Sequence, residues 1–216
     1  MREAIGNIWQ LAKGHIVVIT TNGFVKKNGE CVMGRGIALQ AKKLFPNIPT
    51  KLGSLIKSSG NQVYQLGAYG PYKDIWTFPV KRAWDQSYTT NVVEHMQHMF
   101  RQGERVPGWA LVADPLLINL SAEMVSNLVK FLPDNINIYM PRPGCGAGEL
   151  LWENVKPWLE NLLCDRFICC DYSPRSVVGT ELVHNKLFPP VVAHYNDDAT
   201  DDDPDPYTYE GIPNSE

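Results

Sequence analysis

Cys31-Val32-Met33-Gly34-Arg35-Gly36-Ile37-Ala38 is the first of two glycine-rich turns in this chain, and the second is Met140-Pro141-Arg142-Pro143-Gly144-Cys145-Gly146-Ala147-Gly148. Each turn follows an apolar stretch typical of a strand and leads into a stretch typical of a helix. Glycine lets a backbone come close to a ligand, and the N–H groups at a helix N-terminus favour anions. Two such turns that face each other across a sheet predict a site that holds a diphosphate from both sides.

The surrounding sequence alternates between strand and helix patterns. Short apolar runs predict buried strands at 16–19, 136–140 and 167–170. Amphipathic spacing predicts helices at 37–45, where Pro46 ends the helix, and at 116–132 and 150–163. The runs 62–66 and 74–78 are spaced as two strands of a hairpin, joined by a Gly-Pro turn. This order predicts an α/β fold with a mostly parallel or mixed sheet covered by helices, and a ligand outside the carboxyl ends of the strands.

Two segments do not follow this alternation. Residues 84–113 combine a helix-like piece at 92–100 with a turn-rich piece, and we interpret them as an insertion. The insertion contains His95 and His98, one helical turn apart, without an evident third ligand, so we expect a surface or interface role and no metal site. Periodicity fades from 172 onward, and we expect a C-terminal extension at 172–216 that is acidic and mobile from about 196.

The composition indicates one α/β domain, 1–171, followed by that extension. The chain has 216 residues, 44% of them apolar, which suffices for a sizeable core. Its net charge of −3 gives no general attraction for nucleic acid, although a local basic cleft remains compatible with it. The five cysteines have neither metal-binding nor disulfide spacing, which indicates reduced thiols. Without an apolar run of ~18 residues or a signal-peptide core, we expect a cytoplasmic protein with no membrane partner.

The motifs resemble, in their order and spacing, those of the macro domains, a family that binds ADP-ribose. They are most similar to the branch that contains terminal ADP-ribose glycohydrolases and the antitoxins that remove ADP-ribose from DNA, including phage-encoded relatives. The resemblance covers about 5–83 and 114–171, and it is carried by Gly6–Trp9, Val17–Asn22, Met33–Gln40 with Lys42–Pro46, Phe78–Arg82, and Pro141–Gly148 with Trp152–Val155. It implies a three-layer α/β/α fold with a mixed, mostly parallel sheet.

The resemblance implies that the two glycine turns hold the diphosphate of ADP-ribose. The ligand-binding residues of the first turn are then Met33, Gly34, Arg35, Gly36 and Ile37, with the N-terminus of the next helix behind them. Those of the opposing wall are Gly144, Cys145, Gly146, Ala147 and Gly148. Arg142 is a further candidate ligand, and its alternative is a solvated or packing residue.

Two asparagines are assigned to the ends of the ligand by the same resemblance. Asn22 ends a strand where the family places an asparagine against the distal ribose, and its alternative is a turn-forming asparagine before Gly23. Asn7, with Ile8, stands at the adenine end, where the family usually has an aspartate. Asn7 keeps an acceptor but loses the charge, so adenine binding is expected to survive with altered strength, and a cap or turn asparagine is the alternative.

Lys81 is the candidate catalytic residue. In the relatives a lysine in a Phe-Pro-x-Lys-Arg segment attacks the anomeric carbon of the distal ribose or otherwise assists release of the ADP-ribosyl group. An amine is nucleophilic only when its pKa falls well below ~10.4, and we expect burial or the neighbouring Arg82 to lower it. An ordinary surface lysine is the alternative. Some relatives carry a catalytic aspartate at the position of Gly148, whereas the DNA-acting antitoxins have a glycine there too. Glu149 is a possible acid/base that replaces this aspartate.

The expected function is therefore ADP-ribose binding with lysine-dependent hydrolysis of ADP-ribosyl groups from a macromolecule, without a cofactor. Two alternatives remain open: a non-enzymatic reader or sponge of ADP-ribose or a related nucleotide signal, and a phosphatase acting on ADP-ribose 1″-phosphate. Nucleic acid is a possible partner through a local basic rim formed by Lys26, Lys27, Arg35, Lys42, Lys43, Lys81, Arg82 and Arg142.

Overall fold

The structure is a computed structural model of the chain, and it describes residues 1–88 and 90–171. The predicted C-terminal extension, 172–216, lies outside the described residues together with its acidic run. Among the helices of the described ranges, none has both the length and the apolar character needed to cross a membrane.

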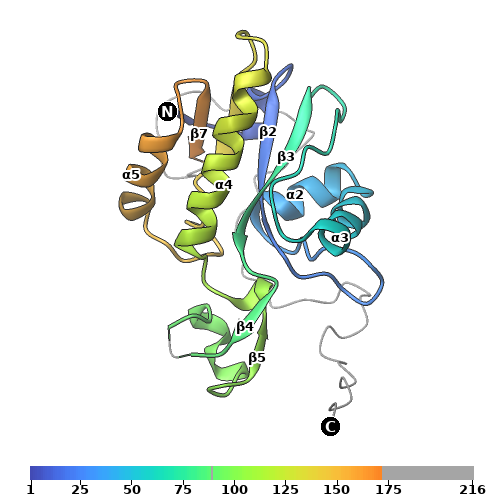
Figure 1. Cartoon of the computed structure of the whole chain (residues 1–216), viewed down its shortest axis with the longest axis vertical. Helices are drawn as coiled ribbons and strands as arrows, with labels where there is room; N and C mark the ends of the chain where they lie inside the picture. Colours follow the sequence, from blue (N-terminus) through green and yellow to red (C-terminus); the bar gives the residue numbers. More distant parts are fainter. Residues whose placement is uncertain (89, 172–216) are drawn as a thin grey trace, which may run out of the picture. The chain divides into compact units, whose positions relative to one another are not determined.

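Five parallel strands form the central sheet in the order β1-β7-β6-β2-β3 (Figure 1). These strands are β1 Arg2–Ile5, β2 Ile16–Asn22, β3 Asp74–Lys81, β6 Ile138–Pro141 and β7 Phe167–Asp171. The α-helices are α1 Ile8–Leu11, α2 Gly36–Leu44, α3 Ile48–Ser59, α4 Pro115–Leu128 and α5 Trp152–Leu162. Short 3₁₀ helices complete the list at η1 Glu94–Met99, η2 Gly108–Ala110 and η3 Val129–Phe131.

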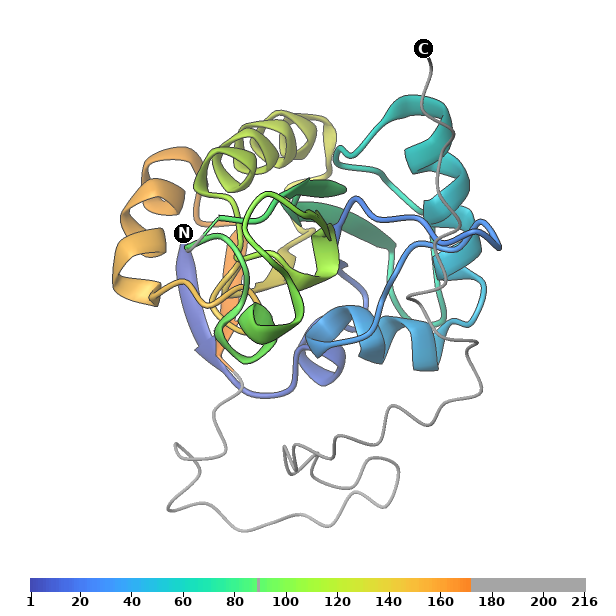
Figure 2. The same cartoon turned by 90° about the horizontal axis from the view of Figure 1, so that it is seen from below.

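The alternation of side chains along β2 sets the two outer layers. Ile16 and Val18 face one side of the sheet, and Val17 and Ile19 face the other. The first side packs against α4 and α5 through Phe78, Ile118, Val125, Met140, Val155 and Leu159. The second side packs against α1, α2 and α3 through Trp9, Ile37, Ala41, Ile48 and Leu52 (Figure 2). The predicted three-layer α/β/α fold is therefore confirmed.

The edge of the sheet differs from the predicted hairpin. Residues 62–66 run antiparallel to β3 through one bridge, Gln65 to Trp76, and they do not form a regular strand. The Tyr64 N–H donates to the Thr77 Oγ1 side chain at 2.8 Å, which interrupts a ladder of backbone hydrogen bonds. The sheet is thus mixed only at this edge. Helix α3 and strand β1 are elements that the sequence analysis did not predict.

The insertion is a small substructure of its own. Strands β4 Trp84–Gln86 and β5 Arg105–Pro107 pair antiparallel, and η1 and η2 pack on them. Its core consists of Val92, Val106, Ala110 and Leu111, with Met96, Phe100 and Trp109 around them. Figure 2 looks onto this substructure at the end of the sheet where the parallel strands point. The helix-like piece at 92–100 is a 3₁₀ helix, η1, rather than an α-helix.

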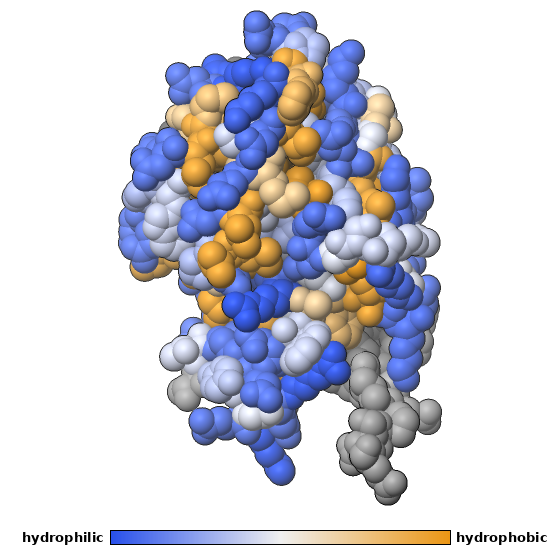
Figure 3. Space-filling view, viewed as in Figure 1, coloured by the Kyte–Doolittle hydropathy of each residue, from blue (hydrophilic) through white to orange (hydrophobic). Residues whose placement is uncertain are grey.

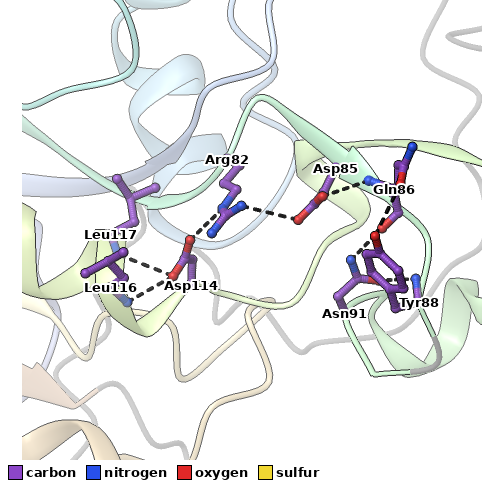
Figure 4. A network of polar contacts seen from close by, with 8 residues as sticks. All are labelled: Arg82, Asp85, Gln86, Tyr88, Asn91, Asp114, Leu116 and Leu117. Atoms are coloured by element: carbon purple, nitrogen blue, oxygen red, sulfur yellow. Dashed lines mark hydrogen bonds and ion pairs between the residues drawn. The ribbon is translucent and has the colours of Figure 1, made fainter. Parts of the chain in front are cut away.

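One charged network joins the insertion to α4 (Figure 4). The Arg82 guanidinium donates to Asp114 at 2.7 Å and lies 3.5 Å from the Asp85 carboxylate. The other oxygen of Asp114 caps α4, because it accepts the N–H groups of Leu116 at 2.9 Å and Leu117 at 3.4 Å. Asp114 thus stabilises both the start of α4 and the base of the insertion.

Replacing Asp114 by alanine is expected to lower the free energy of unfolding by roughly 1–3 kcal/mol, because a cap and a charge-assisted hydrogen bond are lost together. Urea unfolding measures this change. Asp134→Ala is the control, since Asp134 is fully exposed and lies 3.9 Å from Arg166, and its expected effect is below ~0.5 kcal/mol. Equal effects of the two substitutions would contradict the assigned role of Asp114.

Candidate functional site

The candidate site lies where the three strands β6, β2 and β3 end side by side. The first glycine turn follows β2, the second follows β6, and Lys81 ends β3. In the strand register Asn22 is the partner of Lys81, after an irregularity between Thr21 and Asn22. The parallel order of the sheet therefore brings both glycine turns, Asn22 and Lys81 to one edge, as the sequence analysis predicted for a ligand site.

Lys81 is buried, whereas a lysine in an ordinary environment is exposed and charged at neutral pH. Its side chain is 6% exposed, and Nζ donates to the Ala147 carbonyl at 2.6 Å and to the Trp109 carbonyl at 3.3 Å. Burial lowers the pKa of Lys81 to about 8, with Glu149 opposing and Arg35 reinforcing the shift. A substantial fraction of Lys81 is consequently neutral in mildly alkaline solution, as a nucleophile or base requires.

The cation that assists this shift is Arg35, which corrects the expectation for Arg82. Consecutive residues of an extended chain point to opposite faces, so Arg82 turns away from Lys81. Its guanidinium pairs with Asp114 and Asp85 instead (Figure 4). Arg35, which is 46 positions away in the sequence, acts on Lys81 from the first glycine turn.

The first glycine turn has open space on its outer side. Gly34, Arg35 and Gly36 are exposed, and a Cβ atom built at Gly34 or Gly36 would meet nothing within 4 Å. Gly36 has a φ of +56°, and Arg35 precedes α2 without a side-chain cap, so the first N–H groups of α2 are left for another acceptor. Met33 and Ile37 are buried beneath the turn in the core against α2.

The glycines of the second turn fall into two groups. A Cβ atom at Gly148 would lie 2.6 Å from the Gly144 carbonyl oxygen and 2.7 Å from Ala113, and one at Gly144 would lie 2.9 Å from Ile118. Gly146 has nothing within 4 Å of such an atom. Gly144 and Gly148 are therefore required by packing, whereas Gly146 and the exposed Ala147 face open space.

The two asparagines use their carboxamides within the protein. Asn22 donates to the Val32 carbonyl and accepts the Phe24 N–H, both at 2.9 Å, and so it holds the segment before the first glycine turn. Asn7 caps α1 by accepting the Trp9 N–H at 2.9 Å. Each carbonyl oxygen keeps a second lone pair for a ligand. Ile8, next to Asn7, is buried in the core.

Arg142 forms ion pairs with residues of β1 and β7. Its guanidinium lies 2.9 Å from Asp171 and 3.4 Å from Glu3, and it stacks over the Trp152 ring at 5.1 Å. These contacts are those of the packing alternative. Lys26 pairs with Glu30, and Arg82 with Asp114, so the predicted basic rim offers less free charge than its residue types suggest.

Glu149 follows the second turn in a strained backbone conformation. Its φ is +61°, in the left-handed region, which costs a residue with a side chain about 1–2 kcal/mol. Both of its carboxylate oxygens accept the Glu94 N–H, at 3.0 and 3.1 Å, and one lies 3.7 Å from His95 Nδ1. His95 Nε2 is in turn 2.6 Å from the Arg35 guanidinium. From the sequence, His95 was considered only as a neighbour of His98, and its position between Arg35 and Glu149 was not predicted.

Other reactive groups nearby do not compete with Lys81. Burial raises the pKa of the Cys145 thiol to about 11, which keeps it protonated at neutral pH. In the described part of the chain, no three side chains of His, Cys, Asp or Glu gather as a metal ion requires. Two hollows of about 290 Å³ are lined by residues of α4 and by Asn61, on the face where apolar residues gather in Figure 3. Neither glycine turn lines them.

Several solved structures are similar to this chain. The macrodomain of Mycobacterium tuberculosis DarG has 20% identity and a TM-score of 0.56, and the match covers 80% of this chain and 97% of that one. The macrodomain of Thermus aquaticus DarG has 22% identity and a TM-score of 0.55 over the same shares, 80% and 97%. Thermosipho africanus DarTG in complex with ADP-ribose has 16% identity and a TM-score of 0.55, over 81% of this chain and 42% of that one. No protein-family model and no curated protein matches the sequence.

Proposed function

The chain has the macrodomain fold, and on this basis we propose that it binds ADP-ribose and hydrolyses ADP-ribosyl groups from a macromolecule through Lys81. The diphosphate lies between Gly34–Gly36 and Gly146–Ala147, against the N-terminus of α2. This placement is supported by the open space at both turns and by the attraction of helix N-termini for anions. One of the similar structures, that of Thermosipho africanus DarTG, holds ADP-ribose.

The observation that carries the catalytic proposal is the buried Lys81, with its pKa lowered to about 8, beside Asn22 at the strand ends. The neutral Nζ attacks the anomeric carbon of the distal ribose, and a C–N bond forms while the bond to the macromolecule breaks. The proton lost by Nζ passes to the leaving atom, with Glu149 as the candidate carrier. Water then cleaves the C–N bond, which regenerates Lys81 and releases ADP-ribose.

This mechanism predicts that activity rises with pH through the pKa of Lys81. Protonated Nζ is not nucleophilic, so kcat/KM is expected to fall about tenfold per pH unit well below pH ~8 and to level off above it. Initial rates of ADP-ribose release between pH 6 and 10 measure the profile, with ADP-ribosylated DNA and ADP-ribosylated protein as separate substrates.

Two variants shift that profile in opposite directions. Glu149→Gln removes a charge that raises the pKa of Lys81, so its profile is expected to move to lower pH. Arg35→Met removes a charge that lowers the pKa, so its profile is expected to move to higher pH. An activity that does not change between pH 6 and 9 in the wild type, or variants that shift together, would contradict the proposed role of Lys81.

A further inference from the structure

We propose that His95 is a positioning residue of this site: it bridges Arg35 of the first glycine turn to Glu149 of the second and so holds the insertion over Lys81. The inference rests on the proposed function, because it concerns how the same site is assembled for reaction. His95 lies on η1 of the insertion, and none of the motifs shared with the macro domains contains it.

Three contacts from the insertion converge on the two walls of the site. Arg35 Nη1 lies 2.6 Å from His95 Nε2, and His95 Nδ1 lies 3.7 Å from Glu149 Oε1. The neighbouring Glu94 N–H donates to the Glu149 carboxylate. From η2 of the insertion, the Trp109 carbonyl accepts a hydrogen bond from Lys81 Nζ. One inserted substructure thus contacts the first turn, the residue after the second turn, and the candidate nucleophile.

The chemistry of the groups fixes the state of the imidazole. A guanidinium has donors and no acceptor, so His95 Nε2 must accept from Arg35. The ring proton is then on Nδ1 and points toward the Glu149 carboxylate. The bridge consequently requires a neutral His95, and a protonated ring would present an N–H to Arg35 and break the contact.

The bridge matters for Lys81 because it holds the two charges that act on this residue. Arg35 lowers the pKa of Lys81 and Glu149 raises it, so their separation from Lys81 sets its protonation. Both charges belong to exposed loop residues, and Glu149 occupies a strained backbone conformation. Strain of this kind persists only where the surrounding contacts enforce it, and His95 and Glu94 supply such contacts.

The test compares substitutions of His95 with the same substitutions of His98, which is exposed on the same 3₁₀ helix. His95→Phe is expected to lower kcat for ADP-ribose release about 10- to 100-fold, because misplaced groups cost that much in rate, while the Kd for free ADP-ribose changes less than about threefold. His95→Gln retains a neutral acceptor for Arg35 and is expected to recover most of the lost rate. His98→Phe is expected to match the wild type.

Hydrogen exchange provides a readout besides activity. His95→Phe is expected to raise amide exchange in peptides covering 94–99 and 146–150, and His98→Phe is not. If the wild type binds and hydrolyses while His95→Phe equals His98→Phe in rate and exchange, this inference is overturned and the proposed function stands. If the wild type neither binds ADP-ribose nor releases it, the proposed function fails, and the role of His95 in it fails as well.

Discussion

Lys81→Met is expected to abolish release of ADP-ribose from a modified macromolecule, by at least about 10³-fold in kcat, while binding of free ADP-ribose persists. Methionine has nearly the length of lysine and fits a buried position, but it has no amine to attack the anomeric carbon. Single-turnover release and calorimetry with free ADP-ribose measure the two properties separately. Turnover by the variant at the wild-type rate would contradict the mechanism.

The same substitution is expected to stabilise the fold relative to the wild type at neutral pH. The pKa of Lys81 is about 8 in the folded protein, against 10.5 for a lysine in water, and a pKa difference of one corresponds to ~1.36 kcal/mol. Burying the protonated amine therefore costs about 3 kcal/mol. The net stabilisation by Lys81→Met is smaller than this cost, because the substitution also removes the two hydrogen bonds to the Ala147 and Trp109 carbonyls.

The sign of the pH dependence follows from proton binding. Between pH 8 and 10.5 the unfolded chain binds the Lys81 proton more tightly than the folded protein does, so raising the pH over this window stabilises the wild type. Lys81→Met lacks this gain. Urea unfolding at pH 7.5 and pH 10 measures the difference, and Lys73→Met, at an exposed lysine just before β3, is the matched control that should retain it.

The second large effect is expected at Gly148, where alanine should destabilise the fold by about 3 kcal/mol or more. Its Cβ would enter space already filled by the Gly144 carbonyl oxygen at 2.6 Å and Ala113 at 2.7 Å, and a backbone oxygen cannot move aside as a side chain can. The Ala113 N–H also donates to the Gly148 carbonyl at 2.9 Å, so a shift of the turn breaks this hydrogen bond. Thermal and urea unfolding measure the loss.

Gly146→Ala is the matched control, two residues away in the same turn. Its added methyl group meets no protein atom within 4 Å, so the free energy of unfolding is expected to change by less than ~1 kcal/mol. The methyl group would project into the proposed diphosphate site, and ADP-ribose is expected to bind at least about tenfold more weakly. Equal stability of the two variants, or undiminished ligand binding by Gly146→Ala, would contradict the division of the turn into packing and ligand-facing glycines.

The features that the sequence predicted are those set by local pattern. The short apolar run Ile16 to Ile19 indicated a buried strand, which the structure confirms, and the glycine turns after β2 and β6 indicated a site at the strand ends. Lys81 and Asn22 each end a strand, and parallel pairing brings them into register. The helix that Pro46 ends was likewise predicted, and it spans Gly36–Leu44.

The features that the sequence did not reveal depend on contacts between distant segments. Arg35 and His95 are 60 positions apart, and no periodicity relates an insertion to a glycine turn. Arg82 was expected to act on Lys81 because they are neighbours in sequence, but the extended backbone turns it toward Asp114. Gly148 was predicted to line the phosphate, and its close packing against Ala113 gives a second reason, not visible in the sequence, why no side chain fits there.

Isothermal titration calorimetry of the wild-type chain with ADP-ribose measures whether the space between the two glycine turns holds this ligand. We expect saturable binding at a single site, with a Kd below about 100 µM, that is weakened by Gly146→Ala and retained by Lys81→Met. Absence of binding at millimolar ADP-ribose, or binding that the Gly146 variant leaves unchanged, would contradict this expectation.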